Sequence, residues 1–305
     1  MPMNGVLVVD KPAGPTSFDV VRRVRQLLRI KKVGHTGTLD PLATGVLPLC
    51  LGDDTRIAGY ITEGDKAYDA VLKLGETTDT LDAQGTVLER RPVPPLSAER
   101  LDEVLSRFRG PQLQTPPMYS AVKQGGKRLY ELAREGKEVE RAARPVTVHR
   151  LELRDFSSDG LTLSVECSKG FFVRTLAAEI GEALGCGAHI AALRRTRSGP
   201  FALRHALPLP AIEALVAGGP PGLERLAGQL VDANTALAEL PAYPVSAAAA
   251  QRVVHGVPVE VADAPEGRMR VLDPDGRLLA IAESRGARLR YLRVLQSGSS
   301  PGSGG

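Results

Sequence analysis

Several features that mark common protein classes are scarce or missing in this sequence. Tryptophan is absent and aromatic residues make up only 4%, so an aromatic in polar surroundings becomes a candidate ligand contact. The three cysteines lie far apart without a CxxC pair, which excludes the usual zinc ribbons and disulfide frameworks. No GxGxxG or Walker loop occurs, which argues against nucleotide-cofactor folds.

Long apolar runs are also missing. Nothing approaches the roughly 18 consecutive apolar residues of a membrane span. Met1–Pro12 lacks the basic region and apolar stretch of a signal peptide. We therefore expect a cytoplasmic protein with reduced thiols.

Positive charge is segregated along the chain, although the formal net charge is only +4. Residues 20–32 carry Arg and Lys without a single acid, whereas acids outnumber bases over 53–103. Bases dominate again over 120–154 and 169–204. One such cluster could be a solvated helix face, but three of them favour a basic surface that binds a polyanion.

Hydrophobic periodicity predicts strands and helices that do not alternate as parallel β-α units. Apolar or alternating runs predict strands at Gly5–Val9, Tyr68–Leu74 and Leu161–Cys167. Helical spacing predicts helices from Thr16 or Ser17 to Leu28, over Ser97–Phe108 and over Val173–Leu184. The glycine-rich stretch Gly34–Gly45 is expected to be a loop. The pattern indicates a mixed α+β fold.

Composition divides the chain into two expected domains. Residues 1–240 form the larger one, with Pro/Gly-punctuated helices over 208–240 near its end. Residues 241–296 form a small β-domain. Its short strands are expected at Val257–Val261, Met269–Leu272, Leu278–Ala282 and Leu289–Leu295. The Ser/Gly/Pro tail 297–305 has nothing to bury and is expected to be disordered.

The densest candidate for chemistry is the stretch Gly34-His35-Thr36-Gly37-Thr38-Leu39-Asp40-Pro41. Its glycines allow the backbone to approach a ligand closely. On spacing alone, however, Asp40 could equally be a helix N-cap with proline at the first helical position. His35 could equally be a hydrogen-bonded loop residue. The local pattern leaves both readings open.

Six motifs in the same order resemble the TruB pseudouridine synthase family. They are Val9–Gly14, Gly34–Gly45, Lys66–Gly75, Gln114–Lys123, Gly170–Leu176 and Gly185–Arg195. The resemblance covers about residues 5–205, and the segment after Pro241 is similar in size and position to the family's PUA domain. It implies a largely antiparallel sheet flanked by helices, the pseudouridine synthase fold, with a small barrel-like PUA domain. It also implies an RNA-gripping insert over about 112–144.

The same resemblance assigns the catalytic residues. Asp40 is the indispensable carboxylate, and Arg174 pairs with it and keeps it ionised, because burial alone would raise the pKa of an aspartate. Tyr68 stacks on the extruded uracil. In an unknown fold, Arg174 could instead bind a local acid and Tyr68 could be ordinary core packing.

Further positions are assigned to substrate binding in the same way. His35 enters the RNA loop, Phe172 and Leu193 line the pocket, and Lys11 supports the active-site loop unless it is simply an exposed lysine. The remaining matches are Gly34, Thr36, Lys123 and Arg195. Phe172 departs from the tyrosine of many relatives; it keeps the stacking face and loses a hydrogen bond.

The implied reaction converts the uridine at position 55 in the T-loop of tRNA to pseudouridine. It needs base flipping but no redox step or hydrolysis, hence neither metal nor organic cofactor. We expect the T-arm to contact the larger domain, the PUA-like domain to approach the acceptor end, and no obligate protein partner. The alternatives are a non-catalytic RNA-binding or RNA-folding protein on the same scaffold and, more remotely, a structural protein.

Overall fold

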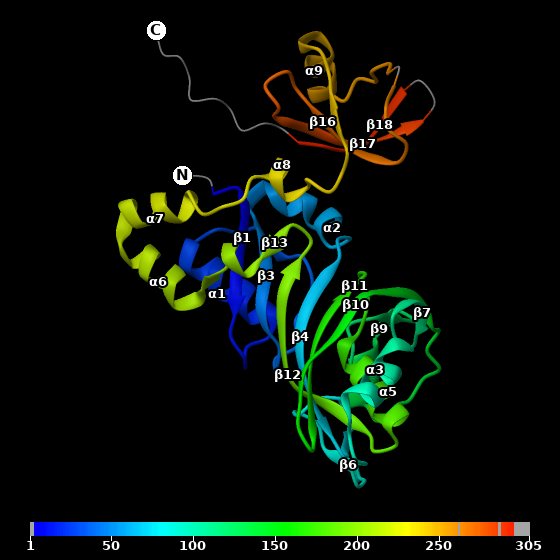
Figure 1. The fold of residues 1–305 in the computed structure, drawn as a ribbon. Helices are drawn as coiled ribbons and strands as arrows, with labels where there is room; N and C mark the ends of the chain where they lie inside the picture. Colours follow the sequence, from blue (N-terminus) through cyan, green and yellow to red (C-terminus); the bar gives the residue numbers. More distant parts are fainter. Residues whose placement is uncertain (1–2, 262, 286–287, 296–305) are drawn as a thin grey trace.

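A computed structural model describes residues 3–261, 263–285 and 288–295, and the predicted tail 297–305 lies outside the described residues. Its main feature is a ten-stranded mixed sheet (Figure 1). Among the strand pairs of this sheet, only β1 with β14 and β3 with β12 are parallel. The path of the sheet is β14 (Leu207–Pro208), β1 (Gly5–Lys11), β3 (Thr44–Leu51), β12 (Ala188–Ser198), β4 (Lys66–Leu74), β11 (Gly160–Cys167), β10 (Arg144–Phe156) and β7 (Gly110–Gln114), with β2 (Val33–His35) on β3 and β13 (Phe201–Ala202) on β12.

Helices and two small ribbons surround this sheet. The helices are α1 (Ser17–Leu28), α2 (Ala58–Ile61), α3 (Ala98–Ser106), α4 (Leu129–Arg134), α5 (Val173–Leu184), α6 (Leu209–Ala217), α7 (Gly219–Ala227) and α8 (Ala233–Ala236), with 3-10 turns η1 (Gly52–Ile57) and η2 (Leu203–His205). The ribbons pair β5 (Glu76–Thr78) with β6 (Val87–Arg90) and β8 (Lys123–Gln124) with β9 (Lys127–Arg128). The mixed, largely antiparallel fold is thus confirmed.

The predicted helices begin and end where their capping residues stand. Thr16 and Asp19 form a capping box at the start of α1, and Ser97 caps α3. Gly185 ends α5 with φ 85°, a left-handed conformation that favours glycine. In Figure 1, α1, α6 and α7 lie toward one end of the large sheet, and α3 and α5 toward the other. Their apolar faces pack with the sheet in one core.

The loop predicted over Gly34–Gly45 is shorter than expected. Its start belongs to β2, whose His35 pairs with Leu49, and its end belongs to β3, which begins at Thr44. Residues 36–43 remain free of helix and strand. Two strands therefore hold both ends of the segment that carries Asp40.

The C-terminal segment contains a four-stranded sheet rather than a closed barrel among the described residues. Its strands are β15 (Ala242–Pro244), β16 (Arg268–Leu272), β17 (Leu278–Arg285) and β18 (Arg288–Val294). The strand expected at Val257–Val261 was a wrong prediction: Glu260 makes only an isolated bridge with Arg288, and Pro258 has no N–H to donate. The sequence reading also missed helix α9 (Ala247–Val254), which Ser246 caps in front of an alanine run.

Apolar side chains join the two parts of the chain. Leu278 and Ile281 of β17 pack in one buried cluster with Val8 of β1, Ile57 of η1 and Phe201 of β13. Figure 1 accordingly places the small sheet beside α2 and α8. Among the described residues, no helix is both long and apolar enough to cross a membrane.

Candidate active site

Asp40 lies in the segment between β2 and β3 and does not cap a helix. The Ala43 N–H donates to the Asp40 carbonyl at 3.0 Å, and the chain then enters β3. The neighbouring Leu39 is tied to the first residue of α1, because the Ser17 hydroxyl accepts from its N–H at 2.8 Å and donates to its carbonyl at 3.0 Å. The interpretation of Asp40 as a helix N-cap is therefore wrong. The loop is held instead by its hydrogen bonds to the start of α1.

Two buried cationic side chains hold the loop that carries Asp40 by donating hydrogen bonds to backbone carbonyls. The Lys11 ammonium donates to the carbonyls of Pro12, Pro41 and Ala43 at 2.9, 3.2 and 2.6 Å. The Arg195 guanidinium donates to the backbone carbonyls of Val46, Thr38 and Gly37 at 2.7, 3.3 and 3.1 Å.

These contacts change the interpretation of both residues. Lys11 is 0% exposed, so the exposed-lysine reading is wrong, and it supports the loop as the resemblance implied. Arg195 is 1% exposed and also lines the pocket in front of Asp40, so it supports the loop while its expected substrate contact stays a prediction. Burial lowers the pKa of Lys11 to about 8, with Asp40 acting in the opposite direction.

Arg174 connects Asp40 with two other segments. It stands in the first turn of α5, and its Nε lies 2.9 Å from Asp40 Oδ2. Its Nη1 donates to the Thr80 carbonyl and its Nη2 to the Tyr119 carbonyl, both at 2.8 Å. The guanidinium, which is planar and has a fixed fork of donors, is thereby oriented by three separate parts of the chain. The expected pairing of Arg174 with Asp40 is present.

A second carboxylate, Asp82, lies beside this ion pair and was missed by the sequence reading. Its Oδ2 is 3.9 Å from Arg174 Nη1, and its side chain is 6% exposed. Its Oδ1 accepts from the Thr80 hydroxyl at 2.7 Å and from the Gln84 N–H at 3.0 Å. The local signal was weak, since a carboxylate that bonds its own neighbouring N–H groups is typical of an ordinary turn.

Burial and the neighbouring charges shift the pKa of Asp40 in opposite directions. Removal of solvent by the surrounding protein raises the pKa of this carboxyl, Arg174 lowers it, and the negative charge of Asp82 raises it again. The net direction is upward. The side chain nevertheless keeps 37% of its surface exposed and lines the pocket, so the carboxylate contacts Arg174 without being enclosed by it.

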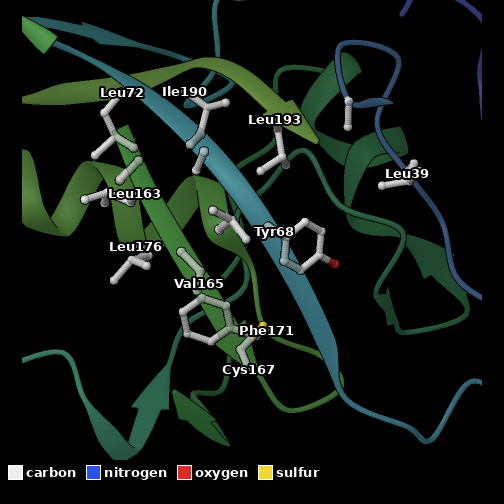
Figure 2. Close-up of a cluster of buried hydrophobic side chains, with 14 of the residues drawn as sticks. Leu39, Tyr68, Leu72, Leu163, Val165, Cys167, Phe171, Leu176, Ile190 and Leu193 are labelled. Atoms are coloured by element: carbon white, nitrogen blue, oxygen red, sulfur yellow. The ribbon is translucent and has the colours of Figure 1, made fainter. Parts of the chain in front are cut away.

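The pocket in front of Asp40 has a volume of about 630 Å³, in the range of small-molecule sites. Asp40, Tyr68, Phe172, Arg174 and Leu193 all line it, although their segments are far apart in the sequence. Figure 2 shows Tyr68 at the margin of the apolar cluster, with its ring beside Leu193 and its hydroxyl directed away from Val165 and Leu176. Burial raises the pKa of Tyr68, so the phenol stays neutral. These walls suit a flat, uncharged ring.

Other predicted site residues do not line this pocket. His35 is half-buried, and its Nδ1 accepts from the Gly37 N–H at 3.4 Å. Gly34 pairs with Cys50 within the sheet, and Thr36 is fully buried, with its N–H donating to Pro48. Lys123 lies exposed on the β8–β9 ribbon of the insert. Their roles therefore remain predictions, and Thr36 can act only through the loop.

Lys66 is a pocket residue that the sequence reading did not select. It is buried, and its ammonium donates to the carbonyls of Thr62 and Gly64. Burial, together with the smaller effect of the Arg195 charge, lowers its pKa to about 8. The sequence offered two hints: Lys66 begins the Lys66–Gly75 motif, and it shares one face of β4 with Tyr68, two residues away.

Comparison with known proteins assigns this architecture to a family. Three family models match consecutive segments: the N-terminal domain of TruB family pseudouridylate synthase (25–173), the tRNA pseudouridylate synthase B C-terminal domain (174–237) and the C-terminal domain of tRNA pseudouridine synthase II (240–296). Two curated relatives are named tRNA pseudouridine synthase B. The protein of Stutzerimonas stutzeri is 46% identical over 97% of this chain and 96% of its own length. That of Pseudomonas aeruginosa is 47% identical over 92% of each.

Solved structures agree with these sequence relatives. The Cbf5 chain of a Cbf5-Nop10-Gar1 complex has a TM-score of 0.77 at 25% identity, covering 96% of this chain and 85% of that one. Cbf5 from an archaeal box H/ACA sRNP Nop10-Cbf5 complex has a TM-score of 0.73 at 23% identity, covering 96% and 86%, and shares the fold. The chain belongs to the TruB family of pseudouridylate synthases.

Proposed function

We propose that this protein is a tRNA pseudouridine synthase that acts on the uridine at position 55 of the T-loop. The observation that carries the proposal is the Asp40–Arg174 ion pair at the edge of a pocket walled by Tyr68 and Leu193. An anion aimed at a site for a flat ring fits an isomerisation that begins at the bond between base and sugar. The curated relatives are named tRNA pseudouridine synthase B, which supports the reaction and the class of RNA.

The reaction breaks the bond between ribose C1′ and uracil N1, turns the base and joins it again through C5, which loses its proton while N1 gains one. Asp40 supplies the carboxylate, either as nucleophile or as the base that removes a ribose proton. Arg174 opposes the effect of burial and keeps this carboxylate ionised. Tyr68 stacks on the uracil, and Phe172 and Leu193 restrict its movement while it turns.

A uridine inside a folded RNA loop reaches this pocket only when it is flipped out. We place the T-arm over the loop that carries Asp40, with His35 contacting the nucleotides left behind. Lys123, exposed on the insert, meets a phosphate. The exposed Arg288 and Arg290 of the edge strand β18 suit the acceptor end. This arrangement requires no obligate protein partner, and the enzyme acts in the cytoplasm.

Purified protein should be incubated with unmodified tRNA and the product scored by a pseudouridine-specific chemical read-out. We expect stoichiometric conversion at position 55 and none in a matched tRNA with cytidine there. Tight binding without conversion would favour the non-catalytic RNA-binding alternative. Conversion at another uridine would retain the chemistry and refute the assigned target.

A further inference from the structure

The insert begins at a buried stem rather than as a free loop. Gln114 and Arg144 are partners at the end of the β7–β10 ladder, so residues 115–143 leave and return at one point of the sheet. Around this point Gln114 and Ser120 are buried at 2% and 4% exposure. Lys123 and Arg128, farther along, are exposed. The insert thus has an exposed tip and an embedded base.

The side chain of Gln114 crosses from this base to helix α5. Its Oε1 accepts from the Phe172 N–H at 2.8 Å, and its Nε2 donates to the Phe172 carbonyl at 3.1 Å. The amide uses donor and acceptor on the same residue, which fixes both position and orientation. Phe172 is the N-cap residue of α5, and its own side chain makes no capping hydrogen bond. Gln114, 58 residues earlier in the chain, therefore holds the backbone at the start of this helix.

A second connection joins the same two segments. Arg174, two residues after Phe172, donates to the Tyr119 carbonyl of the insert at 2.8 Å while it pairs with Asp40. The base of the insert is therefore attached to the first turn of α5 at two points, and that turn carries the cation that orients Asp40. A displacement of this base would shift Arg174, because a buried hydrogen-bonded contact cannot stretch without losing its partner.

We propose that Gln114 is a positioning residue for the reaction: its two bonds to the Phe172 peptide fix the first turn of α5 and link the placement of the insert on RNA to the Arg174–Asp40 pair. This inference rests on the proposed function. It predicts that replacing Gln114 slows the reaction of bound RNA. RNA affinity should not change, since Gln114 is buried in the protein interior.

The test compares Gln114→Leu with Gln112→Leu, a matched control on the same strand. The Gln112 amide donates only to the Phe108 carbonyl, at 2.9 Å, and Phe108 lies outside α5. For Gln114→Leu we expect kcat to fall roughly 10- to 100-fold, as small misplacements of catalytic groups do, with KM and RNA Kd within about twofold of the parent. Gln112→Leu should retain parental kcat and KM.

Gln114→Glu keeps the test decisive if Gln114→Leu fails to fold. When protonated, the carboxyl group that this substitution introduces can accept from the Phe172 N–H and donate to its carbonyl, whereas the ionised form cannot donate. The kcat of Gln114→Glu, divided by that of the parent, should therefore rise as pH falls, and the same ratio for Gln114→Leu should stay flat. Arg174 and Arg144, the charged groups on the adjoining segments, favour the ionised form and move this rise to lower pH.

Three results would overturn the inference: parental kcat in Gln114→Leu, a loss confined to KM or Kd, or an equal loss in Gln112→Leu. If Gln114→Leu does not fold, a flat ratio for Gln114→Glu overturns it as well. A parent that forms no pseudouridine refutes the proposed function and this inference with it. An active parent with unaffected Gln114 variants refutes the inference alone.

Discussion

Replacing Arg195 by methionine separates a loop-supporting role from an RNA-binding role. Methionine fills much of the same space without any donor, so the carbonyls of Gly37, Thr38 and Val46 lose the partner they have at 2.7 to 3.3 Å. A buried acceptor left unpaired costs at least about 1 kcal/mol, so three of them give a loss of roughly 3 kcal/mol in the free energy of unfolding. For a chain of 305 residues that corresponds to a decrease in Tm of roughly 5 °C.

The Arg195→Met substitution should lower the catalytic rate by more than the loss of folding stability alone would explain. Gly37 and Thr38 immediately precede Leu39 and Asp40, so a loosened backbone displaces the carboxylate from Arg174. We expect the single-turnover rate on saturating T-loop RNA to fall roughly 100-fold. RNA affinity and its salt dependence should remain near those of the parent, because Arg195 is 1% exposed and its guanidinium donates to three backbone carbonyls.

Arg194→Met is the matched control for this experiment. Arg194 precedes Arg195 on β12, but its partly exposed side chain pairs with Asp10 at 2.8 Å instead of holding the loop. It should leave both Tm and rate close to parental values, since such ion pairs contribute little. An Arg195→Met protein with parental Tm and a flatter salt slope would refute the reasoning and indicate that Arg195 contacts a phosphate.

Three further outcomes follow from the same structure. Lys123→Ala should weaken RNA binding and reduce the dependence of log Kd on log salt by about one ion, with turnover at saturating RNA unchanged; an unaltered slope in a filter-binding titration would contradict this. Because Asp82 raises the pKa of Asp40, the rate that needs ionised Asp40 falls as pH drops through that raised pKa, and Asp82→Asn should move this fall to lower pH in single-turnover profiles; a shift to higher pH would contradict it. Amide hydrogen exchange at the exposed tip, residues 123–128, should slow when tRNA binds, and equal protection in both states would count against the insert as an RNA-gripping element.

The parts of the fold that the sequence predicted are those coded locally. Thr16 and Asp19 specify the start of α1, and Gly185 specifies the end of α5, through bonds that span a few residues. The helix α9 was equally local, since Ser246 stands before an alanine run, but the strand-rich surroundings concealed it. Val257–Val261 was misjudged because apolar content alone does not supply a strand partner.

The site was predictable only in part. The Asp40–Arg174 pairing followed from motif resemblance, and the structure contains it at 2.9 Å. The burial of Arg195 could not be inferred, because arginine side chains are mostly exposed in proteins. Its three carbonyl partners come close to it only when β12 pairs with β3 in the folded sheet. The contacts of Gln114 and Asp82 could not be predicted for the same reason. Their partners Phe172 and Arg174 are distant in sequence, and no periodic pattern encodes such contacts.

The central claim is that Asp40 is the catalyst, and Asp40→Asn tests it most directly. Asparagine is nearly isosteric and preserves the Ala43-to-Asp40 backbone bond that shapes the turn, but it cannot act as a carboxylate nucleophile or base. Pseudouridine formation and RNA binding should be measured on the same unmodified T-loop RNA, with Tm as the check on folding. We predict no detectable pseudouridine with an RNA Kd within a few-fold of the parent. A folded Asp40→Asn protein that converts uridine at a rate near the parent's would contradict the account.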